Sequence, residues 1–345
     1  MTALSMPAGP GNGAGLRPVP WRRMAWVTWR QHRAALAGVA ALLGALAAYL
    51  LITGLRMHHA YAAVAACRPA GSLACSYAVS DFEVAYRSPA EAIAALLQAV
   101  PALFGAFVAA PVLARELETG TFRFAWTQGF GRARWALAKL VPLAVAVAAA
   151  AGALSVLFSW YFAPFFALGL QTPLAPTLFD LRGVAFAAWT LAAFAIGAAA
   201  GILIRRVVPA IAATLAVWAG LALAAGLFLR QRYLAPLVMH RPDVPGSGWI
   251  IGQGYTGHNG QPLSQAAISQ MLQAYHPATH KIGPNTTQTF LNPVGYITQH
   301  GYTYWVSYQP VSRFWPFQWI EGGCLLGLSL VLIAATIWLV RRRAA

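Results

Sequence analysis

A polar segment, residues 114–139, carries the side chains best suited to chemistry or contact, and it lies between two long apolar runs. Its key residues are Glu116, Glu118, Gly120, Thr121 and Arg123, followed by Arg132, Arg134 and Lys139. Neighbouring carboxylates can accept charge-assisted hydrogen bonds from basic groups of a partner, and a glycine lets the chain turn closely past them. We therefore expect the segment to touch a cytoplasmic partner. The alternative is a loop that only stays solvated.

The chain lacks the motifs of common catalytic sites. It has no Gly-x-Ser-x-Gly elbow and no His-Glu-x-x-His pair. A phosphate-binding loop needs Gly-Lys-Ser or Gly-Lys-Thr, but the two lysines, Lys139 and Lys281, follow Ala138 and His280. The chain is therefore not expected to be an enzyme or to hydrolyse ATP alone.

The histidines are poorly arranged for a metal ion. His276 and His280 are spaced as two ligands on one helix face would be, but Pro277 interrupts that helix. No carboxylate or thiolate accompanies them at ligand spacing, so we predict no metal site.

Cysteine is sparse in this chain, which has three. Cys67 and Cys75 lie in one connection between apolar runs, and their spacing allows a disulfide if that connection faces outward, although the spacing leaves free thiols equally open. Cys324 lies inside the last apolar run, where we expect a small buried residue.

The composition indicates which secondary-structure elements carry these residues. Apolar residues make up 59% of the chain and charged residues 9%, and the mean hydropathy is +0.58, which excludes an ordinary soluble domain. The apolar runs are about 20 residues long, enough for a helix to cross a bilayer. We predict an all-α integral membrane protein with six spans: Ala34–Gly54, Ala92–Leu113, Leu140–Tyr161, Val184–Ile204, Val207–Leu229 and Ile320–Val340.

The orientation follows from the basic residues of the connections. The N-terminal arm, the second-to-third connection, the fourth-to-fifth hairpin and the C-terminal tail together hold fifteen basic and two acidic residues. The remaining connections hold nine basic and six acidic residues over more sequence. Lys and Arg stay on the cytoplasmic side during insertion, so we predict a cell-membrane protein with both termini in the cytoplasm.

This topology also accounts for the net charge of +16, which in a soluble protein would suggest nucleic acid. No basic stripe is interleaved with stacking aromatic residues, so no nucleic-acid binding is expected. Coupling to an ion gradient is disfavoured as well, because the spans offer no ionisable group at mid-membrane depth. If the protein moves a solute, the energy must come from a partner.

The domain organisation follows from these assignments. Residues 1–19 are predicted to be a flexible arm, and residues 20–33 an amphipathic helix in the membrane interface or a plain extension of the first span. Residues 34–229 form a five-span region, and residues 320–345 the last span and its basic tail. Between them, residues 230–319 are expected to form a small mixed extracytoplasmic domain. It should contain an amphipathic helix after Pro262 and strand-like sequence over residues 286–308.

Gly197 and Gly201 in the fourth span form a small-xxx-small face that lets helices approach closely. Such a face serves either a second copy of the chain or packing within it, and internal packing is the commoner use.

The sequence Arg115-Glu116-Leu117-Glu118-Thr119-Gly120-Thr121, with the basic residues that lead into the third span, resembles the cytoplasmic coupling segment of type-two ABC transporter permeases. Six spans and a largest outer loop before the last span resemble that family too. The segments Tyr308-Gln309-Pro310, Arg313-Phe314-Trp315 and Gln318-Trp319-Ile320-Glu321 are similar to those preceding the last span in actinobacterial permeases of this kind.

The resemblance implies one permease half of an exporter, paired with a second six-span half and two ATPase subunits that bind the ATP. Glu116 and Glu118 would meet basic groups of the ATPase, and Gly120 would provide the turn. The spans are compatible with an apolar or amphipathic cargo. Two other classes stay open: a membrane scaffold or sensor with a ligand-binding outer domain, and an enzyme that acts on lipid with a histidine base.

Overall fold

The computed structural model describes residues 21–69, 71–120, 132–257, 259–275, 278–283, 286–290 and 293–343. Among these residues, six helical segments are long and apolar enough to cross a membrane. The segments are Ala37–Ala65, Leu73–Thr119, Arg132–Ala167, Gly183–Ile204, Val207–Arg232 and Val311–Arg342. The predicted all-α membrane protein with six spans and a small sheet domain near the C-terminus is therefore confirmed.

The first two helices are longer than the spans predicted for them. Helix α1 (Trp21–Ala65) continues past the predicted end at Gly54, and α2 (Leu73–Leu103) begins well before Ala92. The connection 55–91 is therefore mostly a helical hairpin rather than a separately folded loop, because a helix satisfies its own backbone wherever it lies. A disulfide between Cys67 and Cys75 closes the tip, with Cα atoms 5.7 Å apart. Residues 21–33 are continuous with the first span; their place in the interface stays a prediction.

The second span changes its helix type along its length. Pro101 removes one backbone donor from α2, and the chain then forms a π-helical turn, η1 (Phe104–Ala109), before α3 (Ala110–Thr119) resumes the regular helix. The π-turn lies against α7 (Gly183–Ile204), where a side chain at Gly105 would strike the carbonyl of Ala193. Pro101 thus marks a packing feature of the bundle.

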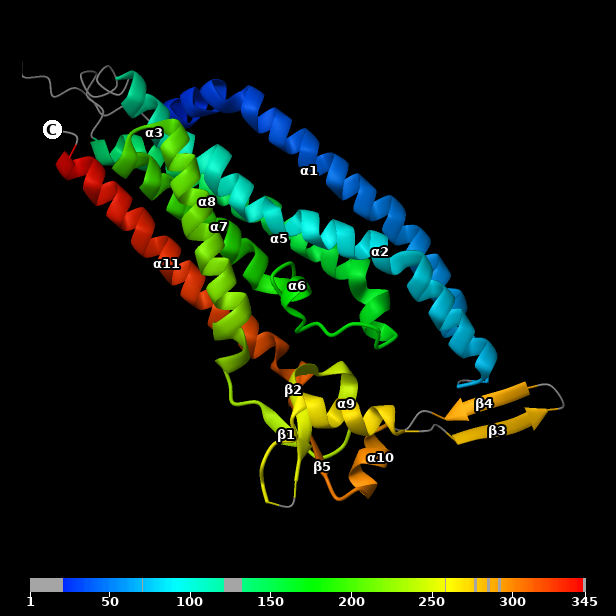
Figure 1. Ribbon diagram of the computed structural model, residues 1–345. Coiled ribbons are helices and arrows are strands. Elements are labelled where there is room, and N and C mark those ends of the chain that lie inside the picture. Colours follow the sequence, from blue (N-terminus) through cyan, green and yellow to red (C-terminus); the bar gives the residue numbers. More distant parts are fainter. Residues whose placement is uncertain are drawn as a thin grey trace, which may run out of the picture.

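Helix α7 lies at the centre of the bundle, with α5 (Arg132–Ala167), α8 (Val207–Ala224) and α11 (Phe314–Arg343) packed around it (Figure 1). Its Ala- and Gly-rich sequence permits this position, since small side chains let several neighbours approach at once. A Cβ atom at Gly197 would strike the carbonyl oxygen of Gly105, and one at Gly201 would lie 2.6 Å from that of Ala110. The small-residue face is therefore used within the chain, against the second span.

The sheet domain follows α8 through the π-turn η2 (Ala225–Leu229) and the short helix η3 (Arg230–Arg232). Three antiparallel strands stand in the order β1-β5-β2, with bounds Leu237–Met239, Thr303–Gln309 and Trp249–Thr256. Two short helices, α9 (Gln265–Gln273) and α10 (Pro293–Gln299), cover a core centred on Ile297 and Val306. Two further short helices are η4 (Pro245–Ser247) and η5 (Val311–Arg313).

The amphipathic helix predicted after Pro262 is α9, whose first turn is capped by Ser264. The sequence 286–308 is only partly extended, because α10 interrupts it between β4 (Thr286–Phe290) and β5; β4 pairs with β3 (Ala278–Gly283) as a separate hairpin.

Two side chains fasten the sheet domain to the bundle. Gln309, at the end of β5, donates to the carbonyl of Leu234 at 2.7 Å, and Arg313 donates to the carbonyl of Ala235 at 2.6 Å. Both bonds join the chain leaving α8 to the chain entering α11, so the sheet domain is held at both of its connections.

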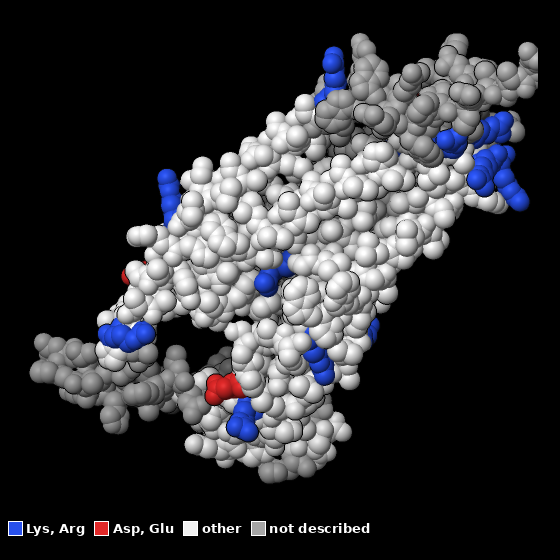
Figure 2. Space-filling view, turned by 180° about the vertical axis from the view of Figure 1, so that it is seen from behind, with Lys and Arg blue, Asp and Glu red and all other residues white. Residues whose placement is uncertain are grey.

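The two ends of the bundle differ in charge. The described start of α1, helix α3 and the end of α11 lie at one end, which we call the basic end, and the sheet domain lies at the other, the sheet end (Figure 1). Figure 2 shows Lys and Arg gathered where α11 finishes and few charges along the flanks. Cys324, expected to be buried, is exposed on α11, as suits a helix surface that faces lipid.

Candidate functional site

The predicted coupling segment begins as the last turns of α3. Gly120 ends this helix in the left-handed region, with φ of 73°, a conformation that glycine adopts without the steric cost of a Cβ atom. Thr121 and Arg123, the other predicted contact residues, lie outside the described residues. The structure thus places Glu116, Glu118 and Gly120 together on one helix end.

Glu116 forms an ion pair with Lys139 in the first turns of α5. The Lys139 side chain is only 7% exposed and also lies over the ring of Trp135, 5.0 Å from its centroid. A charge this well buried needs its partner, because leaving a buried charged group unsatisfied costs at least about 1–3 kcal/mol. The pair therefore ties the end of α3 to the start of α5, across the two ends of the coupling segment.

Glu118 binds a different helix. Its carboxylate accepts a hydrogen bond from the backbone N–H of Val207, the first residue of α8, at 3.0 Å. The cap residue of α8, Arg206, offers no side-chain acceptor of its own, and a negative charge at a helix N-terminus is favourable. Glu118 therefore caps α8 from α3.

Both acids thus have partners inside the chain, which the sequence did not reveal. Glu116 is turned into the bundle, whereas Glu118 stays exposed and reachable while it caps α8. The arrangement joins three spans at the basic end: the second through α3, the third through α5 and the fifth through α8. A force applied to α3 would reach two other helices through two side chains.

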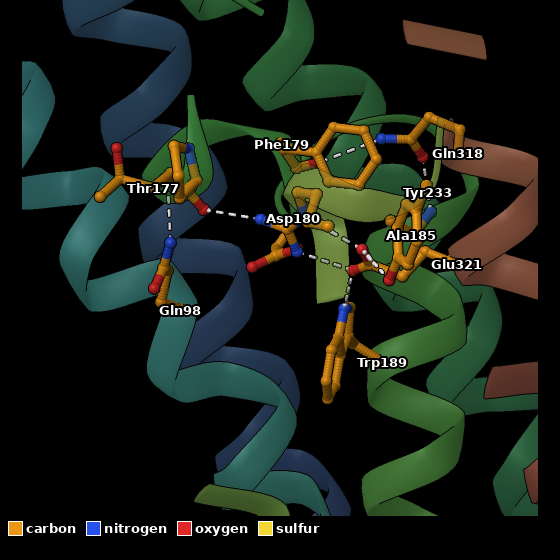
Figure 3. Close-up of polar contacts among 11 residues, drawn as sticks. Gln98, Thr177, Phe179, Asp180, Ala185, Trp189, Tyr233, Gln318 and Glu321 are labelled. Carbon is orange, nitrogen blue, oxygen red and sulfur yellow. Dashed lines mark hydrogen bonds and ion pairs between the residues drawn. The ribbon is translucent and has the colours of Figure 1, made fainter. Parts of the chain in front are cut away.

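A second polar cluster lies buried at the sheet end, where the sequence predicted no site. The guanidinium of Arg230, fully buried, donates to both carboxylate oxygens of Glu321, from Nε at 3.0 Å and from Nη2 at 2.7 Å. Trp189 Nε1 and the Tyr233 hydroxyl donate to the same carboxylate at 2.7 and 3.0 Å (Figure 3). Arg230 also pairs with Asp180 and lies over the ring of Phe179. We call Arg230, Glu321 and Asp180 the buried triad.

The triad has two carboxylates for one guanidinium. Glu321 is 3% exposed and Asp180 27% exposed, so Asp180 forms the more open side. The pKa of Asp180 is raised to about 7, mainly by burial; the Arg230 guanidinium opposes this rise and the Glu321 carboxylate adds to it. Burial also raises the pKa of Tyr233, whose hydroxyl then stays a donor to Glu321.

The triad also joins helices through its surroundings. Gln318, one turn before Glu321 on α11, donates to the carbonyl of Phe179 at 3.0 Å and accepts from the N–H of Ala185 at 2.8 Å. The second bond satisfies a free donor in the first turn of α7. The connection between α5 and α7, with its short helix α6 (Pro176–Phe179), is thereby held against α11.

A cavity of about 540 Å³ opens beside the triad, between α2, α6, α7 and α8. Asp180, Thr177 and Gln98 lie at its polar end, where the amide of Gln98 donates to the carbonyl of Thr177 at 2.7 Å. The rest of its wall is mostly apolar, lined by residues that include Leu181, Phe186, Trp189, Trp218, Leu223 and Leu227. Across the described residues, no group of three His, Cys, Asp or Glu side chains is placed to hold a metal ion.

Only one signal in the sequence pointed to the triad. Glu321 is the one acid in an apolar run, and such a residue needs a buried partner. Arg230 and Asp180 lie 91 and 141 positions before it and fall in predicted connections, so the sequence could not identify them as those partners.

Comparisons with known proteins give one match. A sequence profile of the family described as ABC-2 membrane transporter related matches residues 40–230, which is more than half of the chain and includes α3, α5 and α8. No curated protein and no solved structure matches the chain.

Proposed function

Because the chain belongs to the ABC-2 membrane transporter related family, whose members act as transport permeases, we propose that it is the permease subunit of an ATP-driven exporter. A separate cytoplasmic ABC ATPase binds and hydrolyses the ATP. A second six-span half, identical or different, completes the path. The cargo is apolar or amphipathic and leaves the cell through the plasma membrane.

The orientation of this proposal places the basic end in the cytoplasm. The basic side chains gathered where α11 ends support it, since Lys and Arg are retained on that side (Figure 2). The disulfide at the other end supports it as well, because disulfides persist outside the cytoplasm. Helix α3 then faces the compartment that holds ATP.

The hydrogen bond from the N–H of Val207 to Glu118 is the main support for coupling between the ATPase and the membrane helices. It connects the helix nearest the proposed ATPase contact directly to the start of α8, while Glu116 connects the same helix to α5. When ATP closes the ATPase subunits and displaces α3, these two bonds pull on the third and fifth spans. Thr121 and Arg123, which lie outside the described residues, are proposed as further contacts with the ATPase.

Co-purification tests the proposal. The chain is tagged, expressed with the ABC ATPase encoded nearest to it, extracted in mild detergent and analysed by mass spectrometry. The ATPase should be recovered in stoichiometric amount, and its hydrolysis rate should depend on the permease. Recovery of the intact permease without any ABC ATPase, repeated in nanodiscs, would contradict the proposal.

A further inference from the structure

The cavity beside the buried triad combines features that point to one class of ligand. It runs along η2 and α8 from Leu227 to Trp218, nine residues or about 14 Å at 1.5 Å per residue. Leu223 and Leu227 in its wall are each 59% exposed, so the cavity borders the surface that faces lipid. Its volume of about 540 Å³ lies in the range that holds a small amphiphile.

The charges of the buried triad indicate which end of the cavity binds the head group of the ligand. Asp180 and Glu321 share the single guanidinium of Arg230, and Glu321 takes the better geometry, with two bonds from Arg230 and one each from Trp189 and Tyr233. Asp180 keeps the open side of the triad and lines the cavity. The polar end of the cavity therefore carries a surplus carboxylate and favours a positively charged donor.

The apolar wall of the cavity indicates the chemistry of the ligand's tail. Phe186, Leu223 and Leu227 also line the cavity, and they favour an alkyl chain over a polar group. The Nε1 atom of Trp218, also in the wall, is buried without a hydrogen-bond partner among the described residues. Apart from this one N–H group, these side chains offer the ligand no hydrogen-bonding group.

We propose that this cavity binds a single-chain cationic amphiphile, with its ammonium group on Asp180 and its alkyl chain along α8 toward Trp218. The inference names the substrate class of the proposed exporter and so rests on the proposed function. The binding itself needs no ATPase, so it is measured on the permease alone. Export measured with the ATPase then fails or succeeds separately.

The probe is ω-bromododecylamine, added to the permease in nanodiscs of zwitterionic phosphatidylcholine. Bromine quenches tryptophan fluorescence on contact, so a chain lying along α8 quenches Trp218. Quenching should saturate in the wild type, be absent for empty nanodiscs, and fall in Trp218→Phe. Loss of saturation in the wild type, or unchanged quenching in Trp218→Phe, would overturn the placement of the chain.

Head-group chemistry is tested by matched probes and variants. Asp180→Asn should weaken binding of the amine about tenfold to a hundredfold, the range for losing a hydrogen bond to a charged group. It should leave ω-bromododecanol unchanged. Asp81→Asn removes an exposed acid of α2 and should change neither probe. Equal amine binding by wild type and Asp180→Asn would overturn the role of Asp180, and stronger binding of ω-bromododecanoate than of the amine would overturn the cationic class.

Two further experiments distinguish binding in the cavity from general partition of the probe into the membrane. Ala219 lines the cavity and is exposed, so Ala219→Trp fills the space without disturbing the core and should abolish saturable binding of both probes. Saturable binding in a monodisperse Ala219→Trp sample would overturn the site. Ammonium binding must also displace the proton that Asp180 carries near pH 7, so amine affinity should rise about tenfold from pH 6 to pH 8.

The groups facing Asp180 that could share this titration are Arg230, Glu321 and Tyr233, and Gln98 of α2 is neutral. A pH dependence that persists in Asp180→Asn would assign the titration to another of these groups and overturn this step.

Discussion

Replacing Glu321 by alanine is expected to destabilise the sheet end of the bundle strongly. Glu321 accepts four hydrogen bonds: two from Arg230, one from Trp189 and one from Tyr233. Arg230 is fully buried, so the variant leaves a guanidinium with only Asp180 to balance it. Breaking a buried pair by removing one partner costs about 3–5 kcal/mol, or roughly a hundredfold to several thousandfold in the ratio of folded to unfolded protein.

The assay is equilibrium unfolding in detergent, followed by tryptophan fluorescence. Glu91→Ala serves as the matched control, because it removes one acid from an exposed pair with Arg87 and should cost less than about 1 kcal/mol. The double variant Arg230→Met with Glu321→Leu should recover most of the loss, since apolar residues can replace a buried pair. A Glu321→Ala protein within about 1 kcal/mol of wild type, or a double variant no better than the single one, would refute this reasoning.

Three shorter predictions follow from the same structure. Gly197→Ala should destabilise the protein by about 1–3 kcal/mol, because its Cβ atom would strike the carbonyl of Gly105. Gly220→Ala, with open space around it, should not destabilise the protein. Thermal unfolding compares the two variants, and equal midpoints would contradict the packing of Gly197 against Gly105. The raised pKa of Asp180 favours its protonated form on folding, so the contribution of Asp180 to stability should be complete below about pH 4 and be lost as pH rises through about 7. Asp180→Asn should remove this part of the pH dependence, and an unchanged slope would assign it to another group. Cys67 and Cys75 should resist alkylation until reductant is added, while Cys324 reacts in detergent; labelling of both without reductant would exclude the bond.

The spans were predictable because hydrocarbon imposes one requirement, a run of about 20 apolar residues, that each helix meets by itself. The ends of α1 and α2 were not. The bilayer does not require a helix to end at the membrane surface, so both helices continue into residues 55–91, which lie between the predicted spans.

Contacts between residues far apart in the sequence could not be predicted either, because they depend on how the helices pack. The small face of Gly197 and Gly201 indicated close packing, but the partner, Gly105 and Ala110, depended on how the second span bends after Pro101. Glu116 and Glu118 stood out as the only acids among the predicted cytoplasmic residues, yet their partners at Lys139 and Val207 follow from the assembled bundle. The role of these acids at an ATPase surface stays a prediction.

In the proposed exporter, Glu118 acts either through α8 or through direct contact with the ATPase. If it caps α8, Glu118→Ala should leave the affinity for the ATPase within about twofold of wild type while lowering the amount of cargo exported per ATP. If it contacts the ATPase, the affinity itself should fall about tenfold to a hundredfold, the cost of a lost charged hydrogen bond. Glu91→Ala, at the other end of the chain's second span, controls for loss of an acid.

A rescue variant separates helix stability from coupling. Adding Arg206→Asp to Glu118→Ala gives α8 a cap from its own N-terminus, which should restore the about 0.5–2 kcal/mol lost with the cap but not the connection to α3. The decisive measurement is therefore export per ATP by this double variant, reconstituted with its ATPase. We predict normal stability, normal ATPase binding and impaired export for this variant. Full export would contradict the claim that α3 drives α8 through Glu118.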